Sequence, residues 1–211
     1  EAWAWEQMAI TRARSIVGPA PLMAAIAAVL RERLTQQRDP QTLVRDIAEM
    51  RAKMAHEHPA DSLWEVKHVR GGLIDIEFIA QYLQLLHAHQ HPEVLSVTTV
   101  DALDRLERAG LMEQATHVAL CQALALWQAV QARLRLTLAG PVRPAAGAGV
   151  EAPQALERAV RGLMGLDFET LVDHMTEAAA RVRAIFAQVI EEPAAAAEKA
   201  LLVPADGRHP S

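Results

Sequence analysis

Apolar residues recur along most of the chain at steps of three and four, the spacing of a helix that buries one face. Much of the hydrophobic 51% is alanine and leucine, which favour helices, whereas valine, isoleucine and tyrosine are too sparse for a large sheet. We therefore expect an all-α fold, an antiparallel bundle of about seven helices. The pattern predicts helices over residues 1–17, 21–37, 40–58, 73–89, 98–110, 113–138, about 154–164 and 167–192.

Capping residues mark the starts of several of these helices. Asp39 and Asp167 each precede a predicted helix, and Thr98 or Thr99 precedes another. Short polar side chains in such positions accept a hydrogen bond from the first helical turn. The helix over residues 73–89 is apolar nearly all round, which is typical of a central, buried helix. In the helix before Asp39 we expect one apolar stripe to face the core: Met23, Ile26, Leu30 and Leu34.

The same pattern suggests a division into three parts. Residues 1–17 read as a helix already in progress, so we expect them to close a preceding domain that the chain lacks. Residues 18–192 form the helical bundle, and residues 193–211 carry no core pattern and are expected to be a flexible tail. Proline and glycine predict a loop over residues 139–153. Residues 63–69 alternate locally, which allows at most a short extended segment before Gly71-Gly72.

Composition narrows the function classes. A net charge of −5 argues against a surface for duplex nucleic acid. No apolar run reaches the length of a membrane span, and the N-terminus is not a signal peptide. The single cysteine, Cys121, excludes a disulfide framework, fits a reducing compartment, and is expected to be buried and inert. We expect a cytoplasmic protein that binds neither nucleic acid nor membrane.

The main candidate site is Lys67-x-x-Arg70-Gly71-Gly72, directly before the apolar helix. A glycine pair lets backbone amides approach an anion, and a helix N-terminus adds partial positive charge. Lys67 and Arg70 could then balance the charge of phosphate oxygens. The alternative, a tight turn without a ligand, stays open.

Asp75 and Glu77 follow the glycine pair. Residues two apart on a helix project to different faces, so these two carboxylates are not expected to hold one metal ion. We expect Asp75 to complement the helix N-terminus and Glu77 to be a buried anchor. Its partner would be Lys67 foremost, or else Arg70 or an arginine of the first helix.

Histidines and further arginines complete the candidates. His87, His89 and His91 lie at a helix end without a nearby cysteine, and we interpret them as a solvated terminus. No metal site is therefore expected. Arg12 and Arg14 are either ordinary surface residues or an extension of the anion site.

Two stretches resemble bacterial glutamine synthetase adenylyltransferases, bifunctional enzymes that are also adenylyl-tyrosine phosphorylases. Residues 67–83 (KHVRGGLIDIEFIAQYL) are similar to a signature of that family, and residues 1–14 (EAWAWEQMAITRAR) to the helix that closes its C-terminal, adenylylating nucleotidyltransferase domain. The resemblance covers roughly residues 1–192. It implies a helical domain of an enzyme that uses ATP and Mg²⁺, with glutamine synthetase and the PII signal protein as partners and glutamine as an effector.

One departure from the family limits what the chain does. The Gly-Ser element and the Asp-x-Asp pair that hold Mg²⁺ in the catalytic part are absent, so no catalytic residue is expected here and the chain alone should not transfer AMP. The resemblance implies that Lys67, Arg70, Gly71 and Gly72 face the nucleotide held by the upstream nucleotidyltransferase domain. Supporting roles fall to Asp75, Glu77, Arg12 and Arg14.

Two alternatives remain. The helical domain of a PII uridylyltransferase carries a similar motif, although typically with Gln where Glu77 stands. The other alternative is a helical interaction scaffold without enzymatic function.

Overall fold

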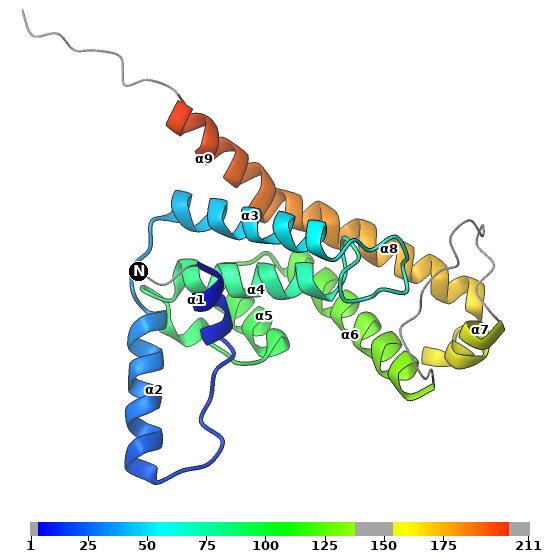
Figure 1. Ribbon diagram of the computed structural model, residues 1–211, viewed down its shortest axis with the longest axis horizontal. Coiled ribbons are helices and arrows are strands. Elements are labelled where there is room, and N and C mark those ends of the chain that lie inside the picture. Colours follow the sequence, from blue (N-terminus) through cyan, green and yellow to red (C-terminus); the bar gives the residue numbers. More distant parts are fainter. Residues whose placement is uncertain (1–3, 138–153, 203–211) are drawn as a thin grey trace, which may run out of the picture.

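The structure, a computed structural model, describes residues 4–137 and 154–202. All regular elements in these residues are helical, which confirms the predicted all-α fold (Figure 1). They are α1 (Ala4–Ile10), α2 (Ala20–Leu34), α3 (Pro40–Glu57), α4 (Leu73–His87), the 3-10 helix η1 (Pro92–Val94), α5 (Thr99–Arg108), α6 (Gln114–Thr137), α7 (Gln154–Val160), the 3-10 helix η2 (Leu163–Gly165), α8 (Phe168–Phe186), the π-helical turn η3 (Ala187–Glu191) and α9 (Glu192–Leu202).

Helix α4 is the centre of the bundle, as its all-round apolar sequence predicts. It packs against α1, α3, α5, α6 and α8. Ile76, Ile79 and Leu85 have no exposed surface, and even its polar Asp75 and Gln84 are buried. Neighbouring helices run antiparallel, α3 against α4 and α9, and α6 against α8 (Figure 1).

Three predicted helix starts are confirmed by their capping hydrogen bonds. Asp39 accepts from the Thr42 amide at 2.8 Å, and Asp167 accepts from the Thr170 amide at 2.8 Å. At α5 the cap is Thr98, whose hydroxyl oxygen accepts from the Asp101 amide at 3.3 Å. These bonds satisfy amides that have no partner within the helix.

The first helix is shorter than predicted. α1 ends at Ile10, and the prediction that it continues to Val17 is wrong. The buried Thr11 hydroxyl donates to the Met8 carbonyl oxygen at 2.6 Å, a local bond that competes with the helical ladder. The following amides tighten to carbonyls three residues back, and the chain leaves the helix. Met8 belongs to the core, so α1 is packed into the bundle.

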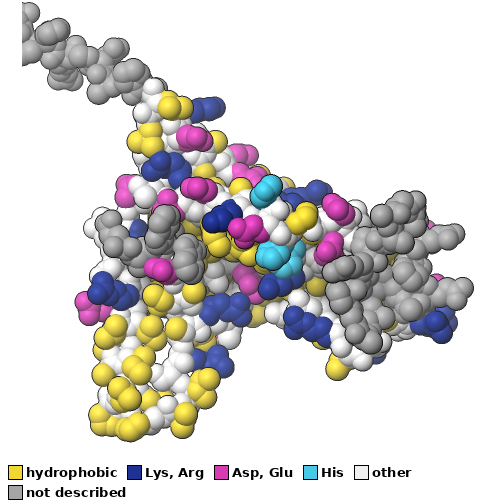
Figure 2. Space-filling view, viewed as in Figure 1, with side chains coloured by type: hydrophobic (Ala, Val, Ile, Leu, Met, Phe, Trp, Pro, Cys, Tyr) yellow, Lys and Arg dark blue, Asp and Glu magenta, His cyan; other side chains and the backbone are white. Residues whose placement is uncertain are grey.

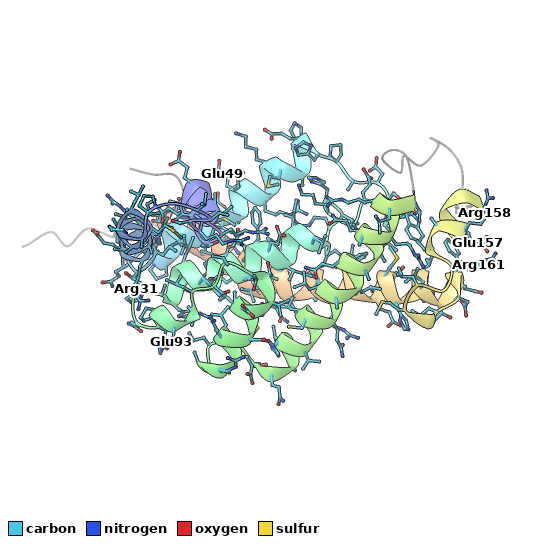
Figure 3. The ribbon with its side chains drawn as sticks, turned by 90° about the horizontal axis from the view of Figure 1, so that it is seen from below. Arg31, Glu49, Glu93, Glu157, Arg158 and Arg161 are labelled. Carbon is cyan, nitrogen blue, oxygen red and sulfur yellow. The ribbon has the colours of Figure 1, made fainter. Side chains whose placement is uncertain are left out.

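Helix α2 projects away from the bundle, and its predicted core stripe is wrong. Of the four stripe residues only Leu34 is buried, and Ile26 is 40% exposed. Figure 2 shows apolar side chains gathered over this region. In Figure 3, Arg31 of α2 lies at one end of the molecule, and the ion pair of Glu157 and Arg161 lies at the other end. The exposed apolar residues here are Ile16, Val17, Leu22, Ile26 and Val29.

The expected tail is helical as far as Leu202. α8, η3 and α9 run on without a break, and η3 and α9 pack on α3. Ala194 and Ala197 of α9 are buried. Alanine is the strongest helix former, and its small side chain lets two helices approach closely. The wide π-helical turn ends two residues before Pro193. The backbone nitrogen of proline has no proton to donate, and its ring needs room in the preceding turn. Residues 203–211 and the predicted loop over residues 139–153 lie outside the described residues.

Gly71 provides a test of the packing. Its φ is +83°, and an added Cβ would lie 2.0 Å from the Ala179 carbonyl oxygen of α8. We expect Gly71→Ala to lower the free energy of unfolding by roughly 4 kcal/mol or more, measured by urea denaturation. Gly110→Ala is the matched control, because Gly110 has φ +70° but no atom of the described residues lies within 4 Å of the added Cβ. There only the backbone cost of about 1–2 kcal/mol applies. Equal losses in the two variants would contradict the close packing of Gly71 on α8.

Candidate functional site

The segment before α4, residues 63–72, is a series of turns and is called the turn below. Residues 63–69 do not form the short extended segment that their alternation allowed. Its amides bond to carbonyls three or four residues back, for example His68 to Glu65 at 2.9 Å. The Glu65 carboxylate accepts from the Asp61 and Ser62 amides at 3.1 and 3.3 Å and fixes the beginning of the segment. The alternation along these residues therefore reflects a compact turn that packs on the core, since Val66 is only 4% exposed.

Gly71 and Gly72 are buried, and their amides are already used within the chain. The Gly71 amide donates to Asp75 at 2.5 Å, and the Gly72 amide donates to the Val69 carbonyl oxygen at 2.8 Å. The Gly71 carbonyl oxygen accepts from Trp127 Nε1 at 3.1 Å. This corrects the expectation that the glycine amides are open to a phosphate. The glycines are required because the turn touches α8 and its own backbone too closely for a side chain.

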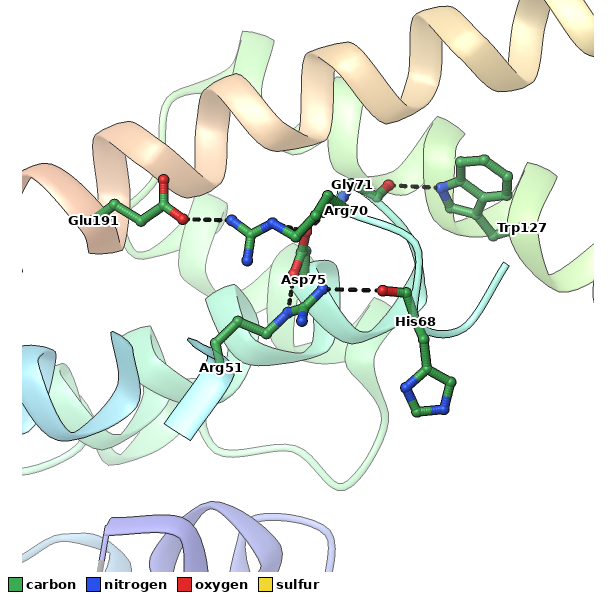
Figure 4. A network of polar contacts seen from close by, with 7 residues as sticks. All are labelled: Arg51, His68, Arg70, Gly71, Asp75, Trp127 and Glu191. Carbon is green, nitrogen blue, oxygen red and sulfur yellow. Dashed lines mark hydrogen bonds and ion pairs between the residues drawn. The ribbon is translucent and has the colours of Figure 1, made fainter. Parts of the chain in front are cut away.

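Asp75 is the centre of the polar network shown in Figure 4. It has no exposed surface, and its Oδ1 accepts from Arg51 Nε at 2.5 Å while Oδ2 accepts from the Gly71 amide. Arg51, 1% exposed, also donates to the His68 carbonyl oxygen at 3.2 Å. Asp75 thus complements the helix N-terminus, as expected. Its second role, neutralising a buried arginine, was not predicted.

Arg70 lies at the edge of this network and is 35% exposed. Its guanidinium forms an ion pair with Glu191 of η3, and its Nε lies 3.9 Å from Asp75 Oδ2. The Cζ atom of Arg70 lies 5.0 Å from the centroid of the Phe186 ring. Such a cation over an aromatic ring is attracted by the ring's negative face. Arg70 therefore connects the turn to the continuous helical segment formed by α8, η3 and α9.

Glu77 has a different partner from the one expected foremost. Its carboxylate pairs with Arg12 Nη1 at 3.1 Å, so the arginine of the first segment is the partner and Lys67 is not. The expectation of a buried anchor is wrong, because the Glu77 side chain is 29% exposed and that of Arg12 is 52% exposed. Arg14 does not join this pair. It lines a surface hollow with Met23 and Arg31 of α2.

Lys67 is exposed at the start of the turn, beside a pair of histidines. The rings of His58 and His68 lie with their centroids 4.9 Å apart. Partial burial, and after it the charge of Lys67, lower the pKa of His68. His68 is therefore neutral at pH 7, and Lys67 supplies the positive charge beside it.

Sequence reasoning missed Arg51, Trp127 and Glu191. A signal for Arg51 exists, because it follows Ile47 by four residues and so lies on the buried face of α3. Trp127 and Glu191 are 56 and 121 residues distant from their partners, and no local pattern marks them.

One further group in the described part of the chain brings metal-ligand atoms together. Asp104, His117 and Cys121 place one ligand atom each within 4.8 Å of one another. His91, by contrast, forms only a surface pair with Glu93 at 3.0 Å. No helix among the described residues has the length and apolar character needed to cross a membrane.

The fold and the turn define an all-α domain whose central helix is held by a buried arginine–aspartate pair. A family model described as GlnD PII-uridylyltransferase matches residues 31–140, more than half of the chain. The chain therefore belongs to this family.

Its curated relatives have another activity in their names. The chain is 41% identical over 190 residues to a protein of Rhodopseudomonas palustris named bifunctional glutamine synthetase adenylyltransferase/adenylyl-removing enzyme. Proteins of the same name from Bradyrhizobium diazoefficiens and Xanthobacter autotrophicus are 39% and 38% identical over 191 and 196 residues. These alignments cover 90%, 90% and 92% of this chain, but the chain spans only 19% of the length of each relative.

The two acidic residues of α4 provide a second test. Asp75→Asn keeps the side chain's shape but leaves the buried Arg51 charge without a counter-ion, so we expect a loss of about 3 kcal/mol in the free energy of unfolding. Glu77→Gln removes a partly exposed pair and should cost less than about 1 kcal/mol. Urea denaturation of both variants measures the difference. If Glu77→Gln lowered the free energy of unfolding as much as Asp75→Asn, burial would not determine how much each ion pair contributes to stability.

Proposed function

We propose that this chain is the helical domain that follows the adenylylating nucleotidyltransferase domain of a bifunctional enzyme of glutamine synthetase regulation. The whole enzyme would transfer AMP from ATP to a tyrosine of glutamine synthetase, and its other half would remove AMP by phosphorolysis. The names of the relatives, at about 40% identity over 90% of this chain, support this proposal.

One observation of the structure carries the proposal furthest, the ion pair between Arg12 and Glu77. It joins the two stretches on which the family resemblance rests, residues 1–14 and residues 67–83. The segment that resembles the end of a nucleotidyltransferase domain thus packs through α1 on α3 and α4. A nucleotidyltransferase domain that precedes α1 would then lie on the side of the bundle formed by α1, α3 and α4, and we propose that it reaches the exposed Lys67 of the turn.

The described residues near the turn do not fit a Mg²⁺ site. Asp75 is engaged by Arg51 and the Gly71 amide, and Glu77 is paired with Arg12, so neither leaves a free carboxylate for a hard cation. We therefore assign ATP and Mg²⁺ to the nucleotidyltransferase domain and no catalytic step to this chain. Its contribution would be a rigid wall that presents Lys67 to the phosphates.

Arg70 is a weaker candidate for nucleotide contact than Lys67. Its charge is already paired with Glu191, whereas Lys67 is exposed. Glutamine synthetase as substrate, PII and glutamine as regulators, and a cytoplasmic location belong to the same proposal for the whole enzyme.

The description of the family model favours a second candidate, the corresponding domain of an enzyme that uridylylates PII. A chimera separates the two. In the Rhodopseudomonas palustris relative, the matching 190 residues are replaced by this chain, and the protein is offered ATP with glutamine synthetase or UTP with PII. We expect label from the α-phosphate of ATP on glutamine synthetase. Label on PII alone, or none from a chimera with full helical content, would overturn the first proposal.

The same chimera tests Lys67. We expect Lys67→Ala to lower kcat/KM for AMP transfer about tenfold to a hundredfold, because a charged hydrogen bond to phosphate is worth about 1.5–3 kcal/mol. The unfolding midpoint should not change, since the side chain is exposed. Lys199→Ala, an exposed lysine on α9, is the control and should keep full activity. Full activity of the Lys67 variant would remove the turn from the active site.

A further inference from the structure

Helices α5 and α6 lie side by side (Figure 3). Three side chains of metal-ligand type lie close together where these helices meet. Asp104 comes from α5, and His117 and Cys121 come from α6. Because His117 and Cys121 are four residues apart, they share one face of the helix. Nothing in the adenylyl-transfer proposal uses these residues.

The spacing of the ligand atoms is close to that of a tetrahedral metal site. Asp104 Oδ1 and His117 Nε2 are 2.7 Å apart, and Cys121 Sγ is 3.4 Å from the same nitrogen. All three atoms lie within 4.8 Å of one another. Zinc bonds of about 2.0–2.3 Å place tetrahedral ligands roughly 3.3–3.8 Å apart, so a shift of less than about 1 Å would open the cluster around an ion.

The surroundings allow an ion to enter. The side chains of Asp104 and His117 are 32% and 20% exposed, and Cys121 is partly buried. Arg108 competes with an ion for Asp104, because its Nη2 is 3.8 Å from Asp104 Oδ2, but its side chain is 72% exposed. The exposed ion pair between Arg108 and Asp104 is weak. It engages Oδ2 of Asp104, while Oδ1 faces His117.

We propose that Asp104, His117 and Cys121 bind Zn²⁺, with water as the fourth ligand, and that the ion clamps α5 to α6. The mixture of thiolate, imidazole and carboxylate suits zinc, whereas Mg²⁺ prefers oxygen ligands alone. On binding, the Cys121 thiol proton passes to the solvent, and His117 coordinates through Nε2 as the neutral imidazole. Burial, and after it the charge of Asp104, raise the pKa of Cys121, so without metal the sulfur is a thiol.

Cobalt provides the direct measurement, because Co²⁺ takes zinc sites and a cobalt–thiolate bond gives a charge-transfer band in the near ultraviolet. We expect the metal-free 211-residue chain to bind one Co²⁺ with this band, and Zn²⁺ to abolish it by displacement. Cys121→Ser should remove the band, and His117→Gln should weaken metal binding at least about tenfold. His91→Gln is the matched control and should bind like the parent, since His91 has a carboxylate partner but no third ligand among the described residues.

A second readout follows from the single cysteine. Zn²⁺ should slow the reaction of Cys121 with an aromatic disulfide at least about tenfold, and Mg²⁺ should not, because only a thiolate ligand is shielded in this way. Circular dichroism of the metal-free variants checks that each is folded. Absence of the cobalt–thiolate band in the folded parent chain, or equal binding by the parent and Cys121→Ser, would overturn the proposal.

Discussion

A guanidinium and a carboxylate, both removed from water, meet where α3 passes the first turn of α4. Taking Arg51 and Asp75 out of water costs several kcal/mol for each ion, and only a complete set of partners offsets that cost. Asp75 has the Gly71 amide and Arg70 Nε as further partners, and Arg51 donates to the His68 carbonyl oxygen. Because these groups belong to α3, the turn and α4, the pair is satisfied in one arrangement of the three. We infer that it specifies how they are assembled more than it adds stability.

The same turn also contacts the helices of the C-terminal half of the bundle. Gly71 touches the backbone of α8 at Ala179 and accepts a hydrogen bond from Trp127 of α6, and Arg70 reaches Glu191 in η3. The glycine pair thus lets the turn pack directly on α8, and the exposed positive charge of the turn comes from Lys67. A site placed on such a fixed turn would hold its geometry when a neighbouring domain binds.

Much of the fold could be predicted from local sequence. The capping side chains of Asp39, Thr98 and Asp167 start their helices as expected, and the all-round apolar sequence of α4 made it central. The errors arise where a distant contact decides. Residues 193–202 lack a core pattern of their own, yet α9 is helical along α3 because alanine permits close packing. Residues 63–69 alternate like a strand, but no neighbouring strand exists among the described residues to pair with them.

For the candidate site, the sequence by itself determined which residues start α4 and that Asp75 would lie at its N-terminus. It also identified Glu77 and an arginine of the first segment as possible partners. Only the tertiary structure decided that Arg51 neutralises Asp75, that the glycine amides are used internally, and that Asp104 meets His117 and Cys121. The reason is physical. Capping and helical periodicity act within a few residues, whereas buried charges are paired across helices whose approach depends on the whole core.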